Sequence, residues 1–577
     1  MNEEVVDQYT FYSYKPRWED MAKTIPNWVG KDHTRRLQAY AMLDAYFHNA
    51  SRLYMNTIDE GQRMERREYG EPHVIVSQTV SSVLGKNGMT IHLRGAEDEP
   101  RQAPTAEEPE GPPPNPLAAA LDQLRDWAKK ERWWIKTVEG ERCASKLGDA
   151  VYVLGWSTAR DRPVLNVWDP NYYFPVWESD WADEEGFNQE FPQRVHLAYE
   201  FEEEVNGNLT KKVRRITWEL LPYADGHELK LPWGTSKVSC FMTDAEWTLD
   251  SLKTKNGETP DVDNFTMTGA VFRFQDEDLG IDFIPVIHVP NNVAELDGFG
   301  TSSIAMVMQI IDDIEANDTD SQKAGALAGT PAIALSGGQA PKDAEGNIRS
   351  YGPGTVWETG EGNMTAVDTS QGLVALNNYG KSMLERLSVN ARIPEAMMGR
   401  IKPSEVPSGI ALWLSFAPHS SMIDEMRLVR EEKYNLMLKF VLRWMVLNSK
   451  VQIEDVGKAF PFVQFGSYLP ADKSEAMTMI TAAMNAAKRP MSTATAVRVL
   501  QDSGFPIPDN AAELALIQSE DFDGASVLGS ATGDLNEARS YLGLPPMVDP
   551  LANQVDAQGN PIVDTGTADQ LPGFTGL

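Results

Sequence analysis

Cysteines and long hydrophobic runs are scarce in this sequence. Cys143 and Cys240 are the two cysteines among 577 residues, too few for a disulfide framework or a site with four thiolate ligands. We therefore expect buried thiols in a reducing compartment. The longest apolar run, 434–447, has 14 residues and contains Lys439 and Arg443, so it is too short and too charged to span a membrane. The first residues show no basic start followed by an apolar core, which argues against a signal peptide.

The patterns of common catalytic sites are also missing. The eight histidines show neither His-x₃-His nor His-Glu-x-x-His spacing, so a zinc site is not expected. There is no Gly-x-Ser-x-Gly turn of a serine hydrolase. Gly380-Lys381-Ser382 resembles the end of a phosphate-binding loop, but Ala375 stands where that motif requires its first glycine.

Two pairs of acidic residues raise the alternative of a metal-dependent nuclease. Asp312 with Asp313, and Asp261 with Asp263, supply the carboxylates that Mg²⁺ prefers. Adjacent carboxylates on a helix point in different directions, however, and no basic partner is patterned nearby. We therefore expect solvated acidic surfaces, no cofactor and no enzymatic activity, with a nuclease or other DNA-processing enzyme as the alternative.

The net charge of −32 argues against a protein that grips nucleic acid over its whole surface, because phosphate affinity comes mainly from lysine and arginine. It is compatible with a protein past which DNA slides. An acidic surface that only maintains solubility is the simpler alternative.

The first half of the chain predicts helices followed by a β-rich region. Apolar spacing and turn residues indicate a helix at 35–55, a helix leading into a strand at 71–93, an amphipathic helix at 117–145 and several strands within 149–290. The stretch 94–116 is rich in proline and glutamate, so we expect an exposed, mobile insertion.

The second half predicts two helices separated by a short β-rich excursion. The first, 301–327, has Thr301 or Ser302 as its N-cap, and the second covers 371–391. A long helix is expected from Ser408 or Ala411 to about 447, bent at Pro418. A strand at 458–470, short helices at 471–488, 492–503, 509–519 and 534–543, and an unpacked tail complete the prediction.

The order of these segments resembles that of siphovirus-type portal proteins of tailed bacteriophages. The run FIPVIHVPNN (283–292) followed by GFGTSSIAMVMQIIDDIEANDTD (298–320) is similar to their first stem helix and the strand before it. SGIALWLSFAP (408–418) resembles the start of their long kinked helix. The strands of 149–177 resemble the wing, and 471–506 resembles the helical crown.

The resemblance implies an α+β fold with an α/β wing, a helical stem, a small β-containing clip, a long kinked helix and a helical crown. The implied boundaries are: wing 1–283 with the insertion 94–116; first stem helix 284–327; clip 328–370; second stem helix 371–392; tunnel loop 393–408; kinked helix and wing return 409–470; crown 471–545; flexible tail 546–577.

The resemblance also implies a dodecameric ring at a capsid vertex, through which double-stranded DNA is packaged and ejected. The implied partners are the terminase large subunit, a head–tail adaptor or connector protein, the major capsid protein and the scaffolding protein, with no membrane. Its expected location is the virion, and the host cytoplasm during assembly.

Two sets of residues are expected to serve this function. Stem helices with apolar stripes need neighbouring subunits to bury them, which predicts an oligomer interface at Ile304, Val307, Ile311, Ile314, Leu376, Leu384 and Leu387. Sparse basic residues near the channel predict weak contacts with DNA at Arg392, Arg400, Lys402, Lys381 and Arg386. For each of these five, a solvated charge or an intersubunit ion pair is the alternative.

Overall fold

The computed structural model describes two compact units of the chain, 1–468 and 469–577. The residues described are 25–51, 67–85, 88–96, 116–177, 191–205, 208–222, 228–252, 261–293, 298–329, 333–337, 342, 347, 362–366, 370–400, 414–453, 456–468, 473–485, 490–502, 505, 507, 513–514 and 516–517. The fold mixes helices and sheets, which agrees with the expected α+β class at that level.

The first unit contains seven of the helices in its described residues. They are α3 (Lys31–Phe47), α5 (Glu71–Leu84), α6 (Pro116–Lys130), α7 (Trp133–Leu147), α8 (Met308–Gly329), α9 (Ser370–Asn390) and α11 (Ala417–Leu447). The predicted helix at 117–145 is two helices, because Arg132 adopts a left-handed conformation between them.

The strands of the first unit pair in antiparallel sheets. The largest has the order β10-β9-β6-β5-β4 and comprises β10 (Val271–Asp278), β9 (Val238–Thr248), β6 (Asn208–Pro222), β5 (Arg194–Val205) and β4 (Tyr173–Val176). The second has the order β11-β2-β3 and comprises β11 (Val286–Pro290), β2 (Asp149–Ser157) and β3 (Arg162–Trp168). Three two-stranded sheets pair β1 (Met89–Leu93) with β14 (Pro461–Phe465), β7 (Leu229–Leu231) with β8 (Gly234–Ser236), and β12 (Ile333–Ser336) with β13 (Asn363–Ala366).

A continuous hydrophobic core joins the helices to these sheets. Helix α11 packs on β14, β11 and α5, while α7 packs on β2 and α5. Large side chains such as Trp133, Tyr152 and Tyr434 are fully buried in this core. The aromatic residues of the region therefore mostly serve packing, and burial of this apolar surface favours folding.

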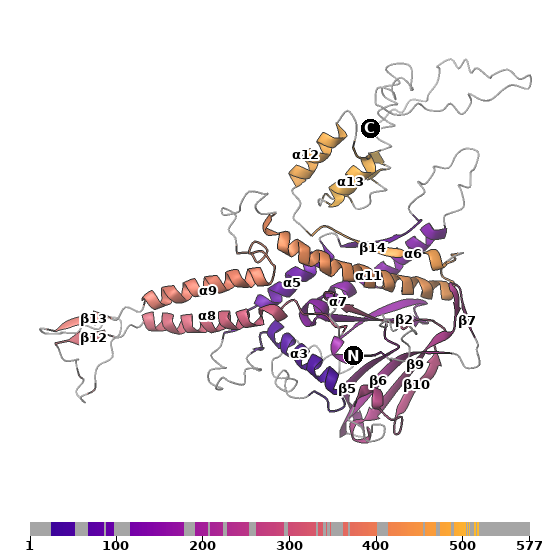
Figure 1. Ribbon diagram of the computed structural model, residues 1–577, viewed down its shortest axis with the longest axis horizontal. Coiled ribbons are helices and arrows are strands. Elements are labelled where there is room, and N and C mark those ends of the chain that lie inside the picture. The colour runs from indigo at the N-terminus through magenta and orange to yellow at the C-terminus, as the bar shows by residue number, and fades with distance from the viewer. Residues whose placement is uncertain are drawn as a thin grey trace, which may run out of the picture. The chain divides into compact units, whose positions relative to one another are not determined.

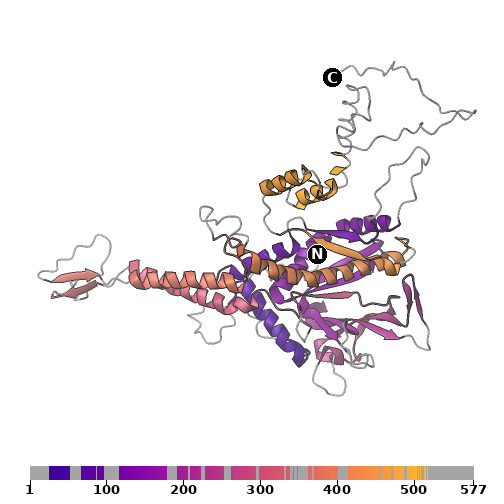
Figure 2. The same cartoon turned by 45° about the horizontal axis from the view of Figure 1, so that its top comes forward.

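Helices α8 and α9 form an antiparallel pair that extends away from the sheets, with β12 and β13 beyond the ends of the helices (Figure 1 and Figure 2). The predicted start of the first of these helices needs correction. Residues Ala305–Val307 form a 3₁₀ turn and the α-helix begins at Met308. Ser302 accepts a hydrogen bond from the backbone N–H of Ile304, the residue before this turn, so it does not cap α8.

The long helix was predicted to bend at Pro418. Instead, the helical conformation is interrupted at Phe416, just before α11 begins. Leu414 and Ser415 are helical, Phe416 forms a turn, and α11 runs from Ala417 with Pro418 in its first turn. Proline is tolerated there because the first-turn N–H groups have no partner within the helix. Residues 401–413, which include the second half of the predicted tunnel loop, lie outside the described residues.

The second unit has two described helices, α12 (Lys473–Met484) and α13 (Thr493–Asp502), which pack on each other. Ile480, Ala496 and Val497 are buried in it. The predicted helix at 534–543, most of the insertion 94–116 and the tail 546–577 lie outside the described residues. In the part of the chain that the structure describes, no helix has the length and hydrophobicity needed to cross a bilayer.

Candidate functional site

The hairpin of α8 and α9 is held together by a close approach of the two helices. A Cβ atom on Gly380 would lie 2.7 Å from Nδ2 of Asn317, so a glycine is needed where the helices meet. Asn317 is buried, and its Oδ1 has no hydrogen-bond partner among the described residues. Because Gly380-Lys381-Ser382 lies inside α9, it forms no phosphate-binding loop.

The residues predicted to face neighbouring subunits are largely covered by their own chain. Five of them are fully buried in the core of the first unit: Ile304, Val307, Ile311, Ile314 and Leu387. Leu376 and Leu384 are half-buried, and Leu384 packs against the core. The predicted interface therefore needs correction, because these five side chains are no longer available to a second copy.

Other apolar side chains of the hairpin remain exposed. They are Met306 just before α8, which is 80% exposed, and Val374, Tyr379 and Val389 on α9, which are 57%, 47% and 75% exposed. Val374 and Tyr379 are five residues apart, which places them about 140° apart around the helix. The exposed apolar surface of α9 therefore covers two flanks.

Lys381 and Arg386 are both exposed on α9. They too are five residues apart, so their directions differ by about 140°. Lys381 shares the flank of Val374, and Arg386 shares that of Tyr379. A single channel-facing surface therefore does not include both cations.

The start of the predicted tunnel loop has a defined geometry. The N–H of Arg392 donates to the carbonyl of Val389, that of Ile393 donates to the carbonyl of Ser388, and Arg392 has φ 53°. This is a Schellman motif, in which the left-handed residue ends the helix. Exposed Arg392 is thereby fixed at the point where the chain leaves α9.

His419 at the start of α11 attaches this point to α5. Its Nδ1 lies 3.0 Å from the carbonyl oxygen of Arg392, and its Nε2 lies 2.9 Å from Oγ of Ser82. Burial lowers the pKa of His419, which favours the neutral ring. In that form Nδ1–H donates to the carbonyl and Nε2 accepts from the serine hydroxyl.

The other predicted DNA contacts are less well defined. Arg400 is half-buried, and its Nη2 lies 4.0 Å from Oε1 of Glu71 at the start of α5. Lys402 lies outside the described residues. Among the five basic residues, Arg392 is therefore the one whose exposed position beside the loop is best defined.

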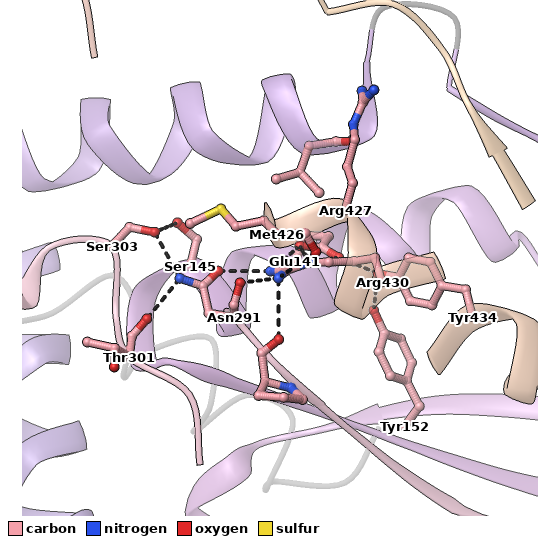
Figure 3. A network of polar contacts seen from close by, with 12 residues as sticks. Glu141, Ser145, Tyr152, Asn291, Thr301, Ser303, Met426, Arg427, Arg430 and Tyr434 are labelled. Atoms are coloured by element: carbon pink, nitrogen blue, oxygen red, sulfur yellow. Dashed lines mark hydrogen bonds and ion pairs between the residues drawn. The ribbon is translucent and has the colours of Figure 1, made fainter. Parts of the chain in front are cut away.

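A buried polar network connects α11, α7 and β11 to the segment that leads into α8, as Figure 3 shows. Arg430 of α11 is at its centre: Nη2 lies 3.0 Å from Oε2 of Glu141 and 2.8 Å from Oδ1 of Asn291. The Asn291 amide donates in turn to the Thr301 carbonyl at 2.9 Å and to Oγ of Ser303 at 3.1 Å. The orientation of the hairpin's base is therefore tied to the long helix.

Two tyrosines complete this network. Tyr434 donates to Glu141, and its hydroxyl lies 3.4 Å from that of Tyr152. Burial, and then the Glu141 carboxylate, raise the pKa of both hydroxyls well above its ordinary value. Both hydroxyls therefore stay protonated, and Tyr434 keeps the Glu141 carboxylate hydrogen-bonded.

The same segment is also held at the start of β2. The Asp149 carboxylate accepts from the Tyr40 hydroxyl, from the N–H of Gly300 at 2.9 Å and from Nε2 of His288 at 2.7 Å. A Cβ atom on Gly148, where φ is 108°, would lie 2.5 Å from the carbonyl oxygen of Gly300. The chain therefore passes too close here for a larger residue.

Neither Arg430 nor Glu141 was predicted from the sequence as part of a buried polar network. Arg430 falls on the same helical stripe as Met426, Tyr434 and Met437, and a charged residue on an apolar stripe is the signal that identifies it. Glu141 has the same position on α7, between Thr137 and Ala144, which are both buried.

The acidic pairs behind the nuclease alternative have partners within the protein. The Asp312 carboxylate accepts from the Tyr46 hydroxyl at 2.9 Å. Asp263 pairs with Arg194 at 2.9 Å and with His196 at 3.0 Å. No group of three or more potential metal ligands is found in the described residues.

In comparisons with known proteins, no model of a protein family matches this chain and no curated protein shows significant similarity to it.

Proposed function

We propose that this chain is the portal subunit of a tailed bacteriophage. Many copies would form a ring through which double-stranded DNA is packaged and ejected. The observation that carries the proposal is the hairpin of α8 and α9, with a two-stranded sheet at its far end, on an α+β body. In a portal these parts correspond to the stem, the clip and the wing.

The distribution of apolar residues on the hairpin supports a ring. Val374 and Tyr379 are exposed on two flanks of α9, and a single partner surface cannot cover both. In a cyclic oligomer each subunit has a neighbour on both sides. Because Lys381 and Arg386 share these flanks, ion pairs with acidic residues of a neighbour are favoured for at least one of them.

The charge of the chain suits a channel for a polyanion. With a net charge of −32 per copy, the ring would repel DNA over most of its surface, and a few exposed cations such as Arg392 would supply weak, salt-dependent contacts. DNA would then pass without sequence-specific binding. The clip would dock the terminase large subunit and later a head–tail adaptor, and capsid and scaffolding proteins would surround the ring.

Negative-stain electron microscopy of the purified protein tests the proposal. We expect rings of about a dozen subunits with a central hole. Val374→Asp combined with Tyr379→Asp should prevent ring assembly, whereas Asn377→Asp combined with Asn378→Asp, which adds the same charge at exposed polar positions of α9, should not. Compact monomers or dimers of the unmodified protein under assembly conditions would contradict the proposal.

The alternative nuclease is tested with the same preparation. Incubation with Mg²⁺ and linear double-stranded DNA should leave the DNA intact. Sustained cleavage that copurifies with the protein, and that is lost in an Asp312→Asn or Asp263→Asn variant, would replace the portal proposal.

A further inference from the structure

We infer that a groove between α5 and α7 receives the exposed face of α11 from a second copy of this chain, centred on Leu428. The inference rests on the proposed ring and names two surfaces that would join its subunits.

The groove is an apolar depression of about 410 Å³. Val76, Val80 and Leu84 of α5 and Trp134, Val138 and Arg142 of α7 line it. Trp134 and Val138 are each 36% exposed, and Ile135 at the rim is 63% exposed. Clustered exposed apolar residues of this kind typically mark an interaction site.

The matching surface is the outer face of α11 in its first half. Asp424, Glu425, Leu428, Glu431 and Glu432 are spaced to lie on one side of the helix, and all five are exposed. Leu428, 66% exposed, is at the centre of this face. A leucine surrounded by carboxylates matches, in polarity and in charge, an apolar groove that is lined by an arginine.

The two surfaces face different directions within one chain. Arg430, which contacts α7 through Glu141, is two residues after Leu428, so the two side chains are about 160° apart around α11. The Leu428 face therefore points away from α7 and cannot reach the groove of its own copy.

Charge decides between a symmetric and a head-to-tail contact. Arg142, Glu425 and Glu431 have no ion-pair partner in the described parts of the chain. Two grooves placed against each other would bring Arg142 against Arg142, and two α11 faces would bring acid against acid. When the groove of one copy contacts the α11 face of another, opposite charges are paired. Repeated head-to-tail contacts of this kind form a ring when the rotation between neighbouring copies closes.

Cysteine cross-linking of the full-length chain tests the contact. In the double variant Val138→Cys with Leu428→Cys, a short bismaleimide should link successive subunits into a ladder of multimers on a denaturing gel. Each single variant should remain monomeric, because only a head-to-tail contact needs both cysteines. The unmodified chain, with Cys143 and buried Cys240, is the control for background linking.

Charge reversal provides a second measurement that does not depend on cysteine reactivity. Arg142→Glu should reduce the fraction of protein in rings at least several-fold, and adding Glu425→Arg and Glu431→Arg should restore it. Arg160→Glu, at an exposed turn between β2 and β3, is the matched control and should leave the rings intact.

The outcomes separate this inference from the proposed function. Rings without the ladder, or rings that tolerate Arg142→Glu, overturn this interface and leave the portal proposal standing. A dimer from either single variant indicates a symmetric contact and also overturns it. If the protein forms neither rings nor a ladder, both proposals fail.

Discussion

Arg430 of α11 and Glu141 of α7 form an ion pair that is fully removed from solvent, although 289 residues separate them in the sequence. Each end of the pair is further hydrogen-bonded: Arg430 to Asn291, and Glu141 to Tyr434. A buried pair of this kind need not add net stability, but removing one partner leaves an uncompensated charge. The pair therefore specifies how the long helix docks against the segment leading into α8.

The first prediction follows from that asymmetry. Arg430→Met should lower the free energy of unfolding by about 3–5 kcal/mol, because Glu141 remains buried without its cation. Adding Glu141→Gln to Arg430→Met should recover part of this loss. Urea-induced unfolding followed by tryptophan fluorescence measures both changes.

Arg443→Met is the control for that experiment. Arg443 is partly exposed, and its Nη1 lies 3.4 Å from Oδ1 of Asp282, so its removal should cost at most about 1 kcal/mol. If Arg430→Met and Arg443→Met lowered the free energy of unfolding equally, burial of the Arg430–Glu141 pair would not be the reason why its disruption is costly.

The second prediction concerns acid sensitivity at His196. This ring is buried between Thr217, whose Oγ1 lies 2.8 Å from Nδ1, and Asp263, whose Oδ1 lies 3.0 Å from Nε2. Burial lowers its pKa from 6.5 to about 4, and the nearby cations Arg215 and Arg194 act in the same direction, against the hydrogen bond to Asp263. The folded state therefore holds the ring neutral over a range in which the unfolded chain protonates it.

The sign of the effect follows from this shift. Between pH 6.5 and about 4 the unfolded state binds a proton that the folded state does not, so stability falls as the pH falls through this range. His196→Gln should flatten the fall, by on the order of 3 kcal/mol at its lower end. His48 and His419, whose pKa values burial also lowers, contribute a slope of the same sign, and buried Asp44 and Asp169, whose pKa values burial raises, contribute one of the opposite sign.

Thermal melting between pH 7 and 4.5 measures this effect, with His92→Gln at a half-exposed position as the matched substitution. The hydrogen bond to His196 lowers the pKa of Asp263. The contribution of Asp263 to the pH dependence of stability therefore falls below the ordinary pKa of a carboxyl group, outside this range. A pH profile unchanged by His196→Gln would contradict the prediction.

The sequence predicted elements whose signals are local. The helix and strand within 71–93 and the helix at 371–391 were predicted within a few residues of α5, β1 and α9. Apolar spacing and turn residues lie within each of these segments, so no distant contact is needed to identify them.

The errors arise where a distant contact determines the structure. Ser302 was predicted as a helix cap, but its hydroxyl donates to the carbonyl of Lys146 at 2.7 Å, which no local pattern reveals. The apolar stripe from Ile304 to Ile314 was assigned to a neighbouring subunit, because the sequence does not show that the same chain covers it. The partners of Arg430 were missed for the same reason.

The third prediction compares two glycines in helices. Gly140 of α7 lies against Tyr152, and a Cβ atom there would overlap the tyrosine hydroxyl. Because Tyr152 is fully buried and a close-packed core resists such a shift, Gly140→Ala should destabilise the fold by about 1–3 kcal/mol. Gly325→Ala in α8, where a Cβ atom meets nothing within 4 Å, should instead stabilise it by about 0.5–1 kcal/mol. The melting temperature should fall for Gly140→Ala and rise for Gly325→Ala. A lower melting temperature for Gly325→Ala would contradict the prediction.

The last prediction concerns the end of α11. The N–H of Lys450 donates to the carbonyl of Met445 at 2.8 Å, and that of Ser449 donates to the carbonyl of Val446 at 3.0 Å. These are the two bonds of a Schellman motif, and Ser449 has φ 56° at the position that favours glycine. Ser449→Gly removes the strain of a side chain in the left-handed region, so it should stabilise the protein by about 1 kcal/mol.

Ser421→Gly, on the exposed side of the same helix, is the control. It should cost about 0.5 kcal/mol or less, because serine has a higher helix propensity than glycine. A gain at Ser449 together with a loss at Ser421, measured by thermal melting at constant pH, would show that backbone conformation and not loss of the hydroxyl decides the sign. Losses at both positions would mean that the helix does not end in this motif.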